Sequence, residues 1–505
     1  MKKIVGMGAA VALAASMFAA EPVANPQVLE FKGNASVEWG VDLDAGKTGF
    51  KNAQEASIKV KLFDGGDKAT SGSGVWAELK IVADTKDNEY KNEQEGSVNI
   101  KAPKVDTAKI HFNNFYVGIQ KGDTETGEFK PQAAIVSDKA WLGNVGPADF
   151  TQGLVFGYDD SNINAGVDFR SFEHTSTQYT NAYAIAAEAT MKDANEWVEG
   201  LEVKGGVSYN LSKNYYEKAD NNLAVKKFAN SVEGSILGYS GSVAYKVALD
   251  DKYYIKPMAG IVGDVLSGEL GTVDYLRNRN EFVASVLFGW GAQVNANAGV
   301  PFLDGDDAKK VTPGVSVVFT MPLPIKETMD SKDKSTYVRD IAKIVPSIYS
   351  GDIFDGLKFG AYSEIILMRD EAEFGSDYMK NACADKDRAT AIAIAAGASY
   401  DVKAGDVTIT TKAGARYANK AYVENSFINK DKDGKEVGLF KDLGYAKDDE
   451  GYLNLKIGAD INGLLDNTTF FVNYTSANLL NETDYADDYY AVKAGTLNVG
   501  AKIHF

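Results

Sequence analysis

Residues 496–505, TLNVGAKIHF, alternate apolar and polar side chains up to the last residue of the chain. One face of an extended strand would carry Leu497, Val499, Ala501, Ile503 and Phe505. Successive side chains of a strand point to opposite faces, and about ten residues let a tilted strand cross a bilayer. The stretch therefore predicts a transmembrane β-strand.

The same alternation recurs along the chain, most clearly at residues 57–62, 201–209, 407–417 and 453–461. There are about 18–20 such segments, and bacterial barrels take even numbers of strands. Polar, glycine-rich stretches of unequal length separate them, including residues 85–97, 122–131, 304–310 and 424–450. We predict an all-β fold, a large antiparallel transmembrane β-barrel of about 18–20 strands with long extracellular loops.

Residues 321–350 break this pattern. They lack alternation, and Tyr337, Ile341 and Ile344 have the spacing of one face of a short helix. Two interpretations stay open: a long loop folded into the lumen, or a linker between two domains.

The first residues, MKKIVGMGAAVALAASMFAAEPVA, have the pattern of a secretory signal. Lys2 and Lys3 precede an apolar stretch rich in small residues, which predicts a signal peptide at 1–20 and a mature chain from near Glu21. The single cysteine, Cys383, allows no intramolecular disulfide. We expect residues 21–505 to form one outer-membrane barrel.

Charged side chains on the alternating segments should face the inside of a barrel. A Lys or Arg facing lipid costs about 2–4 kcal/mol at mid-membrane. The candidate pore-lining residues are Lys59, Lys61, Lys204, Lys412, Arg416, Lys456, Asp460 and Lys502. In the alternative of a soluble periplasmic β protein, these side chains would be the solvated face of a sandwich.

Composition and motifs argue against other classes of function. The formal net charge of −17 disfavours nucleic-acid binding, because phosphates attract Lys and Arg. None of His111, His174 and His504 lies in a nucleophile motif, so no enzymatic activity is expected. Residues 429–434 imitate the start of a calcium loop, but Phe440 stands where the twelfth-position Glu is required. We expect no metal and no cofactor.

Two stretches near the N-terminus carry a family resemblance. Residues 31–63 read FKGNASVEWGVDLDAGKTGFKNAQEASIKVKLF, and residues 74–81 read GVWAELKI. The WGVDL, TGFKN and WAELK motifs within them resemble the N-terminal region of the major outer sheath proteins of treponemes and the related treponemal repeat proteins. The closing VGAKIHF fits as well, whereas between these ends only strand rhythm and loop character agree.

The resemblance implies a surface-exposed protein of the cell outer membrane with pore-forming activity, which forms a homo-oligomer such as a trimer. It also implies binding to host cells and to matrix proteins such as fibronectin. The family is described in two parts, so the resemblance implies an alternative to the single barrel: a periplasmic N-terminal region, 21–320, and a C-terminal barrel made of 351–505 with neighbouring strands. The partners expected in the membrane are outer-membrane lipid and the barrel-assembly machinery, whose signal would be Val499, Ala501, Ile503 and Phe505. We expect a porin for passive diffusion of small hydrophilic solutes. The alternative is a surface adhesin or structural sheath protein whose barrel is only an anchor.

Overall fold

In the computed structural model, the residues described are 29–43, 46–62, 75–84, 104–121, 132–135, 152–171, 183–210, 233–270, 273–295, 300–302, 310–329, 332–336, 340–368, 390–423, 451–480 and 495–504. The predicted signal peptide, the calcium-like turn at 429–434, Cys383 and Phe505 lie outside these ranges. No helix within them is long and apolar enough to cross a membrane.

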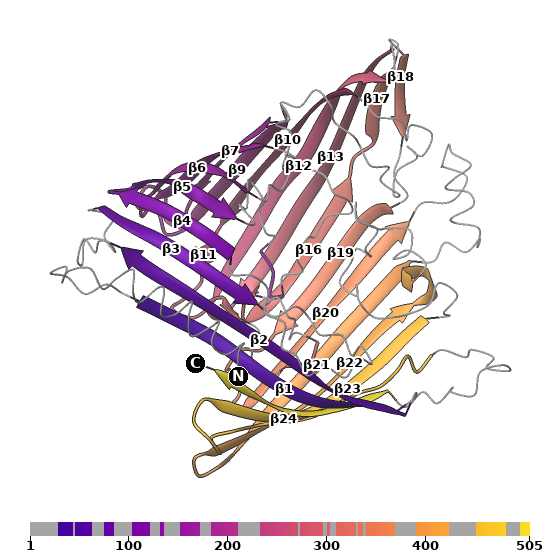
Figure 1. Cartoon of the computed structure of the whole chain (residues 1–505). Coiled ribbons are helices and arrows are strands. Elements are labelled where there is room, and N and C mark those ends of the chain that lie inside the picture. The colour runs from indigo at the N-terminus through magenta and orange to yellow at the C-terminus, as the bar shows by residue number, and fades with distance from the viewer. Residues whose placement is uncertain are drawn as a thin grey trace.

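Nearly all of the described chain is β-strand (Figure 1). The strands are β1 (Leu29–Asp42), β2 (Lys47–Leu62), β3 (Val75–Asp84), β4 (Lys104–Phe112), β5 (Phe115–Lys121), β6 (Gln152–Asp159), β7 (Ile163–Ser171), β8 (Tyr183–Met191), β9 (Leu201–Asn210), β10 (Glu233–Tyr245), β11 (Val247–Ala248), β12 (Tyr254–Leu270), β13 (Val273–Gly289), β14 (Val294–Asn295), β15 (Lys310–Val311), β16 (Gly314–Pro322), β17 (Ile325–Met329), β18 (Lys332–Thr336), β19 (Asp340–Tyr349), β20 (Leu357–Met368), β21 (Ala391–Ala404), β22 (Val407–Asn419), β23 (Gly451–Asn462), β24 (Thr468–Thr475) and β25 (Thr496–His504).

The main sheet closes on itself. Consecutive strands pair antiparallel from β1 to β10, through β12, β13, β16 and β19, and on to β25. The last strand, β25, then pairs with β1, placing Val499 opposite Trp39. Of the 23 strands that the described sheet contains, β11, β17 and β18 are short additions, and the other twenty form the ring. The prediction of a large antiparallel barrel of about 18–20 strands is confirmed.

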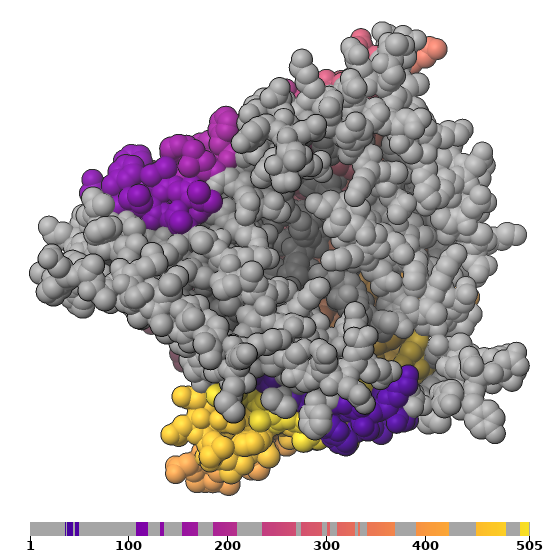
Figure 2. Space-filling view, viewed as in Figure 1, coloured from indigo at the N-terminus to yellow at the C-terminus, as the bar shows by residue number. Residues whose placement is uncertain are grey.

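A closed ring leaves no sheet edge, so every strand finds backbone partners on both sides, as a membrane requires. Its two faces differ in chemistry. Trp39, Val499 and Val472 lie side by side across β1, β25 and β24, and each is 38–43 % exposed. In Figure 2 the indigo of β1 lies beside the yellow of the last strands at this seam. On most strands whose side chains are described, one face carries exposed large apolar side chains, which is what a lipid-facing wall requires.

Links between strands are mostly short at one end of the barrel and mostly long at the other. The clearest exceptions are 290–313 at the first end and 43–46 and 271–272 at the second. The end that holds both termini of the described chain has the links 63–74, 113–114, 160–162, 192–200, 246–253, 290–313, 350–356, 405–406 and 463–467. The opposite end has the links 43–46, 85–103, 122–151, 172–182, 211–232, 271–272, 323–339, 369–390, 420–450 and 476–495. Barrels of this kind have short periplasmic turns and long external loops, so the second end is extracellular.

One periplasmic turn shows how the short links are stabilised. The backbone N–H groups of Ile163 and Asn162 donate to Asp160 Oδ1 at 2.7 and 2.8 Å, and the Tyr158 hydroxyl donates to Oδ2 at 2.7 Å. These hydrogen bonds, that from Ile163 first, lower the pKa of Asp160. The ionised carboxylate therefore holds the turn between β6 and β7.

The described part of residues 321–350 is nearly all strand, so the prediction of a short helical face within a lumenal loop or a linker is wrong. The region forms the end of β16, the hairpin β17–β18, and β19, which is a strand of the ring. Alternation is hidden in β19 because its inner face carries the apolar Val345 and Tyr349, and its outer face carries Ile344 and Ile348. The inner face of this strand carries apolar residues beside Lys343 and Ser347, because it packs against other segments of the chain inside the barrel.

Candidate functional site: the inner face of the barrel

Charged side chains identify the inner face. Lys412 of β22 and Asp460 of β23 form an ion pair, with Nζ 2.8 Å from Oδ2. Their sequence neighbours Ala413 and Ala459 belong to the opposite, apolar face. Since a charge facing lipid is costly, the face that holds this pair must look into the lumen.

The strand register puts most of the predicted pore-lining residues on that same face. Lys204 lies on it in β9, 3.1 Å from Glu202 Oε1, and half-buried Lys456 and Lys502 lie on it in β23 and β25. Exposed Val203, Ile457 and Ile503 stand beside them on the outer face; Arg416 also lies on the inner face, half-buried. For Lys59 and Lys61 the backbone pairs with β3, but their side chains lie outside the described part. A role in conduction stays a prediction for the whole set.

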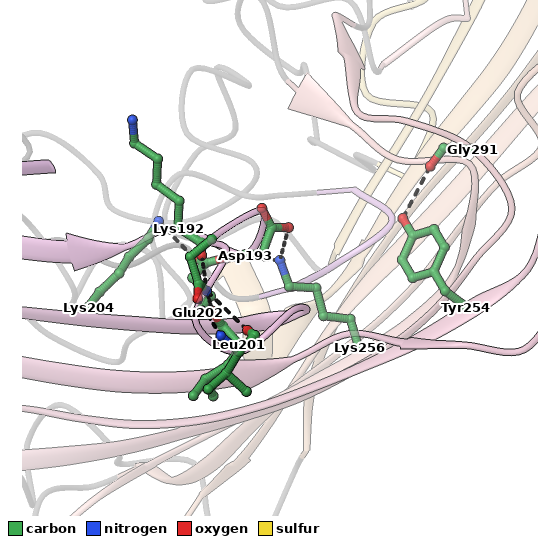
Figure 3. A network of polar contacts seen from close by, with 10 residues as sticks. Lys192, Asp193, Leu201, Glu202, Lys204, Tyr254, Lys256 and Gly291 are labelled. Carbon is green, nitrogen blue, oxygen red and sulfur yellow. Dashed lines mark hydrogen bonds and ion pairs between the residues drawn. The ribbon is translucent and has the colours of Figure 1, made fainter. Parts of the chain in front are cut away.

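A network at the periplasmic end joins two wall strands to a turn (Figure 3). The Lys256 ammonium donates to Asp193 Oδ2 at 3.0 Å and to Glu202 Oε2 at 2.7 Å, while Lys204 contacts the other oxygen of Glu202. Burial alone would raise the pKa of Asp193, but the hydrogen bond and charge of Lys256 lower it overall. The network fixes the turn 192–200 against β9 and β12.

Asn195 shapes this turn from within. Its side-chain amide donates to the backbone oxygens of Lys192, Val198 and Leu201, and its Oδ1 accepts from the N–H of Val198 and Trp197. It is 2 % exposed, so the turn is built around one buried amide. The hydrogen bonds of Asn195 thus set the shape of the turn, and the ion pair of Lys256 with Asp193 attaches it to β12.

Two further ion-pair clusters on the inner face were missed from sequence. In the extracellular half, the Arg279 guanidinium binds Asp264 with two nitrogens, Nε at 3.0 Å and Nη2 at 2.6 Å. Between β19 and β20, Lys343 Nζ lies 3.0 Å from Glu364 Oε1. The only sequence pattern that could have predicted the Asp264–Arg279 cluster is the spacing of Arg277 and Arg279, two residues apart on one face of a strand. No sequence pattern predicts the Lys343–Glu364 pair.

Chain segments cover part of the inner face of β13 and β19–β23. A buried cluster joins wall residues such as Leu287, Tyr362 and Ala395 to Ile135 and Phe302, which belong to links between strands. A second cluster of the same kind joins Ala133 to wall residues of β10, β12, β13, β16 and β19. The lumen is therefore partly filled along this wall.

No three His, Cys, Asp or Glu side chains are grouped as metal ligands in the described ranges. His111 lies on the inner face of β4 beside Tyr116, with ring centroids 5.5 Å apart. The side chains of His174 and His504 lie outside the described residues.

The chain aligns with two treponemal proteins over the whole length of each. It is 26 % identical over 622 aligned positions to the major surface protein MspTL of Treponema lecithinolyticum. It is 26 % identical over 615 positions to the major outer membrane protein MspA of Treponema maltophilum, and both comparisons cover 100 % of both chains. No family model matches the chain.

Comparison with solved structures finds the outer membrane channel DcaP of Acinetobacter baumannii, with a TM-score of 0.29 and 11 % identity over 96 % of this chain and 99 % of that one. It also finds OmpT of Vibrio cholerae, with a TM-score of 0.35 and 9 % identity over 96 % and 100 %.

The full-length relatives are named surface and outer-membrane proteins, and the described chain closes into a barrel with an apolar outer wall. These findings confirm the predicted outer-membrane location and the resemblance to treponemal surface proteins that the sequence motifs indicate. The chain is a surface protein of the outer membrane, homologous over its full length to the treponemal major surface proteins.

Proposed function

We propose that this surface protein is a porin, which lets small hydrophilic solutes diffuse passively through its lumen. The observation that carries the proposal is the closed ring of twenty strands within the described chain. Barrels of about 16–18 strands already leave an aqueous channel, so side chains of a twenty-strand wall do not fill the interior. Diffusion through such a lumen needs no covalent chemistry, no cofactor and no enzymatic activity.

The inner face supports a pore with little preference for charge sign. Several of its cations are paired with anions, as in Lys412 with Asp460 on the neighbouring strand and Lys204 with Glu202 on the same strand. Paired charges of both signs leave no extended field of one sign that would repel anions or cations. We therefore propose neutral and singly charged small molecules as the solutes.

The test is single-channel conductance of the refolded mature chain, residues 21–505, in a planar bilayer. We expect stepwise openings, and liposomes containing the protein should swell in neutral sugars up to a size limit. The same chain added without refolding is the control. A barrel that inserts into the bilayer and conducts nothing would refute the porin and leave a membrane anchor.

Adhesion to host cells and matrix proteins such as fibronectin is a further proposal, which rests on the family resemblance alone. The stretch we predict to bind, residues 424–450, lies outside the described residues. Replacing it with Gly-Ser should leave conductance nearly unchanged and abolish fibronectin binding. Unchanged binding would exclude this loop. Homo-oligomer formation and recognition by the barrel-assembly machinery likewise stay predictions.

A further inference from the structure

Two segments that enter from opposite ends of the barrel meet inside it. Residues 132–135 belong to the extracellular link between β5 and β6, and residues 310–312 belong to the periplasmic link between β13 and β16. Ile135 and Val311 form an antiparallel bridge, beside which the Thr312 N–H donates to the Ala134 oxygen at 2.7 Å. Since β15 also pairs with β14, three short extended segments lie side by side in the lumen. We call residues 132–135, 294–295, 300–302 and 310–312 the lumenal insert.

A row of serines attaches the extracellular part of the insert to the wall. Ser285 of β13, Ser316 of β16 and Ser347 of β19 are buried on the inner face. Their hydroxyl oxygens accept the backbone N–H groups of Gln132, Ala134 and Ile135 at 3.0, 2.8 and 3.1 Å. Three wall strands thus satisfy backbone groups that would otherwise be buried without partners. The insert is bonded to the barrel at defined positions.

A glycine notch receives the periplasmic part of the insert. Gly397 of β21 lies opposite Gly414 of β22, and a Cβ at either position would come closer than 3.0 Å to Pro301. Phe302 follows with a φ of 65°, a backbone conformation rare for residues other than glycine. The Arg416 guanidinium lies over the Phe302 ring, with its central carbon Cζ 4.4 Å from the ring centroid. The wall is shaped for this segment, because larger residues at the notch would exclude it.

The insert divides the inner wall into a covered part and an open part. Under the insert, Val283, Ser316 and Ala395 are at most 2 % exposed. Lys502 of β25 and Glu38 of β1 occupy the same inner face away from the insert and are only half-buried. Among these described residues, those under the insert are shielded from water, whereas Lys502 and Glu38 are not.

We infer that the lumenal insert is the constriction of the pore, and that it confines solutes to the side bounded by β23–β25, β1 and β4–β9. Lys456, Lys502 and Glu38 then line the route and meet the solute. Lys343 and Glu364, on the covered side, have no contact with it. This inference rests on the proposed porin function.

Thiol accessibility tests the division of the lumen without relying on conductance. In a Cys383→Ser background, we compare Lys502→Cys on the open side with Ala395→Cys under the insert. A charged, membrane-impermeant methanethiosulfonate should modify Ala395→Cys at least about tenfold more slowly than Lys502→Cys, because a buried thiol reacts only when its site opens. Replacing residues 300–302 with Gly-Ser-Gly should make Ala395→Cys reactive. Equal rates in the unmodified insert would overturn the inference.

Conductance of the same variants separates this inference from the porin proposal. If both are right, the parent conducts, the Gly-Ser-Gly replacement gives larger steps, and modified Lys502→Cys gives smaller ones. A conducting parent whose step is unaffected by the replacement refutes the constriction alone. No conductance in any variant, with the thiol pattern as expected, refutes the porin alone.

A disulfide tests the meeting of the two segments without disturbing the fold. Ile135 and Val311 form a non-hydrogen-bonded pair, in which side chains approach most closely. Ile135→Cys with Val311→Cys should cross-link on mild oxidation, visible as a gel shift that reductant removes, with conductance unchanged. The control pairs Ile135→Cys with Leu249→Cys, in the exposed periplasmic turn 246–253. Failure of the first pair to cross-link would overturn the inference.

Discussion

Replacing Lys343 with Met should destabilise the barrel strongly. Lys343 Nζ lies 3.0 Å from Glu364 Oε1, and the two side chains are 7 % and 2 % exposed. At that separation and an effective dielectric of about 20, the attraction is about 5–6 kcal/mol. The Tyr422 hydroxyl also donates to Glu364. Removing the ammonium leaves the buried carboxylate without the cation that pairs with it, and breaking a buried pair in this way typically costs about 3–5 kcal/mol.

The assay is urea unfolding of the refolded protein in liposomes, followed by tryptophan fluorescence. The matched control is the double variant Lys343→Met with Glu364→Gln, whose amide oxygen can still accept from Tyr422. Replacing both members of a buried pair is often close to neutral, so the double variant should lose less than half as much stability as the single one. A single variant that costs under about 1 kcal/mol, the value of an exposed pair, would refute the reasoning. So would a double variant that is no more stable.

Three other changes follow from the two faces, the turns and the last strand. Ile457→Lys, on the outer face, should lower the free energy of unfolding in liposomes by about 2–4 kcal/mol, while Asn498→Lys on the inner face should change it little; equal losses would contradict the assignment of faces. Because hydrogen bonds from Ile163 and its neighbours lower the pKa of Asp160, its contribution to stability should be complete above about pH 4, the unfolded value, and disappear as pH falls through the lower folded value. Asp160→Asn should therefore flatten that part of an acid-unfolding curve, and an unchanged curve would argue against the turn. Phe505→Ala should reduce the outer-membrane level in cells while leaving refolding in vitro intact; normal levels would exclude Phe505 from the assembly signal.

The wall strands with one wet and one apolar face could be predicted from sequence. The alternation predicts strands at 407–417, 453–461 and 496–505, and residues 407–417, 453–461 and 496–504 lie within β22, β23 and β25. On these strands a charged or small polar inner face opposes an apolar outer face, and the period of two is easy to see.

The rest could not be predicted, because the inner wall is not uniformly wet. Where the lumenal insert covers it, inner-face positions are apolar, as with Val283 and Val345, and β13 and β19 lose their alternation. The bonds from Ser316 and Ser347 to the insert join residues far apart in sequence, and no local pattern marks them. For the same reason no local pattern marked the Lys343–Glu364 pair, whose members lie 21 residues apart on separate strands.

The seam between β1 and β25 constrains how the barrel is made. Its register sets Asn34 opposite His504, so the two ends of the ring are nearly the whole chain apart. Until the final strand emerges, β1 and β24 are free sheet edges, each able to pair with another copy, and the apolar outer face has no lipid to cover it. Contacts this distant in sequence also form slowly. The polypeptide must therefore stay unfolded during export, bound to a chaperone that covers its strand edges and apolar residues. The barrel can close only when β25 is available to pair with β1.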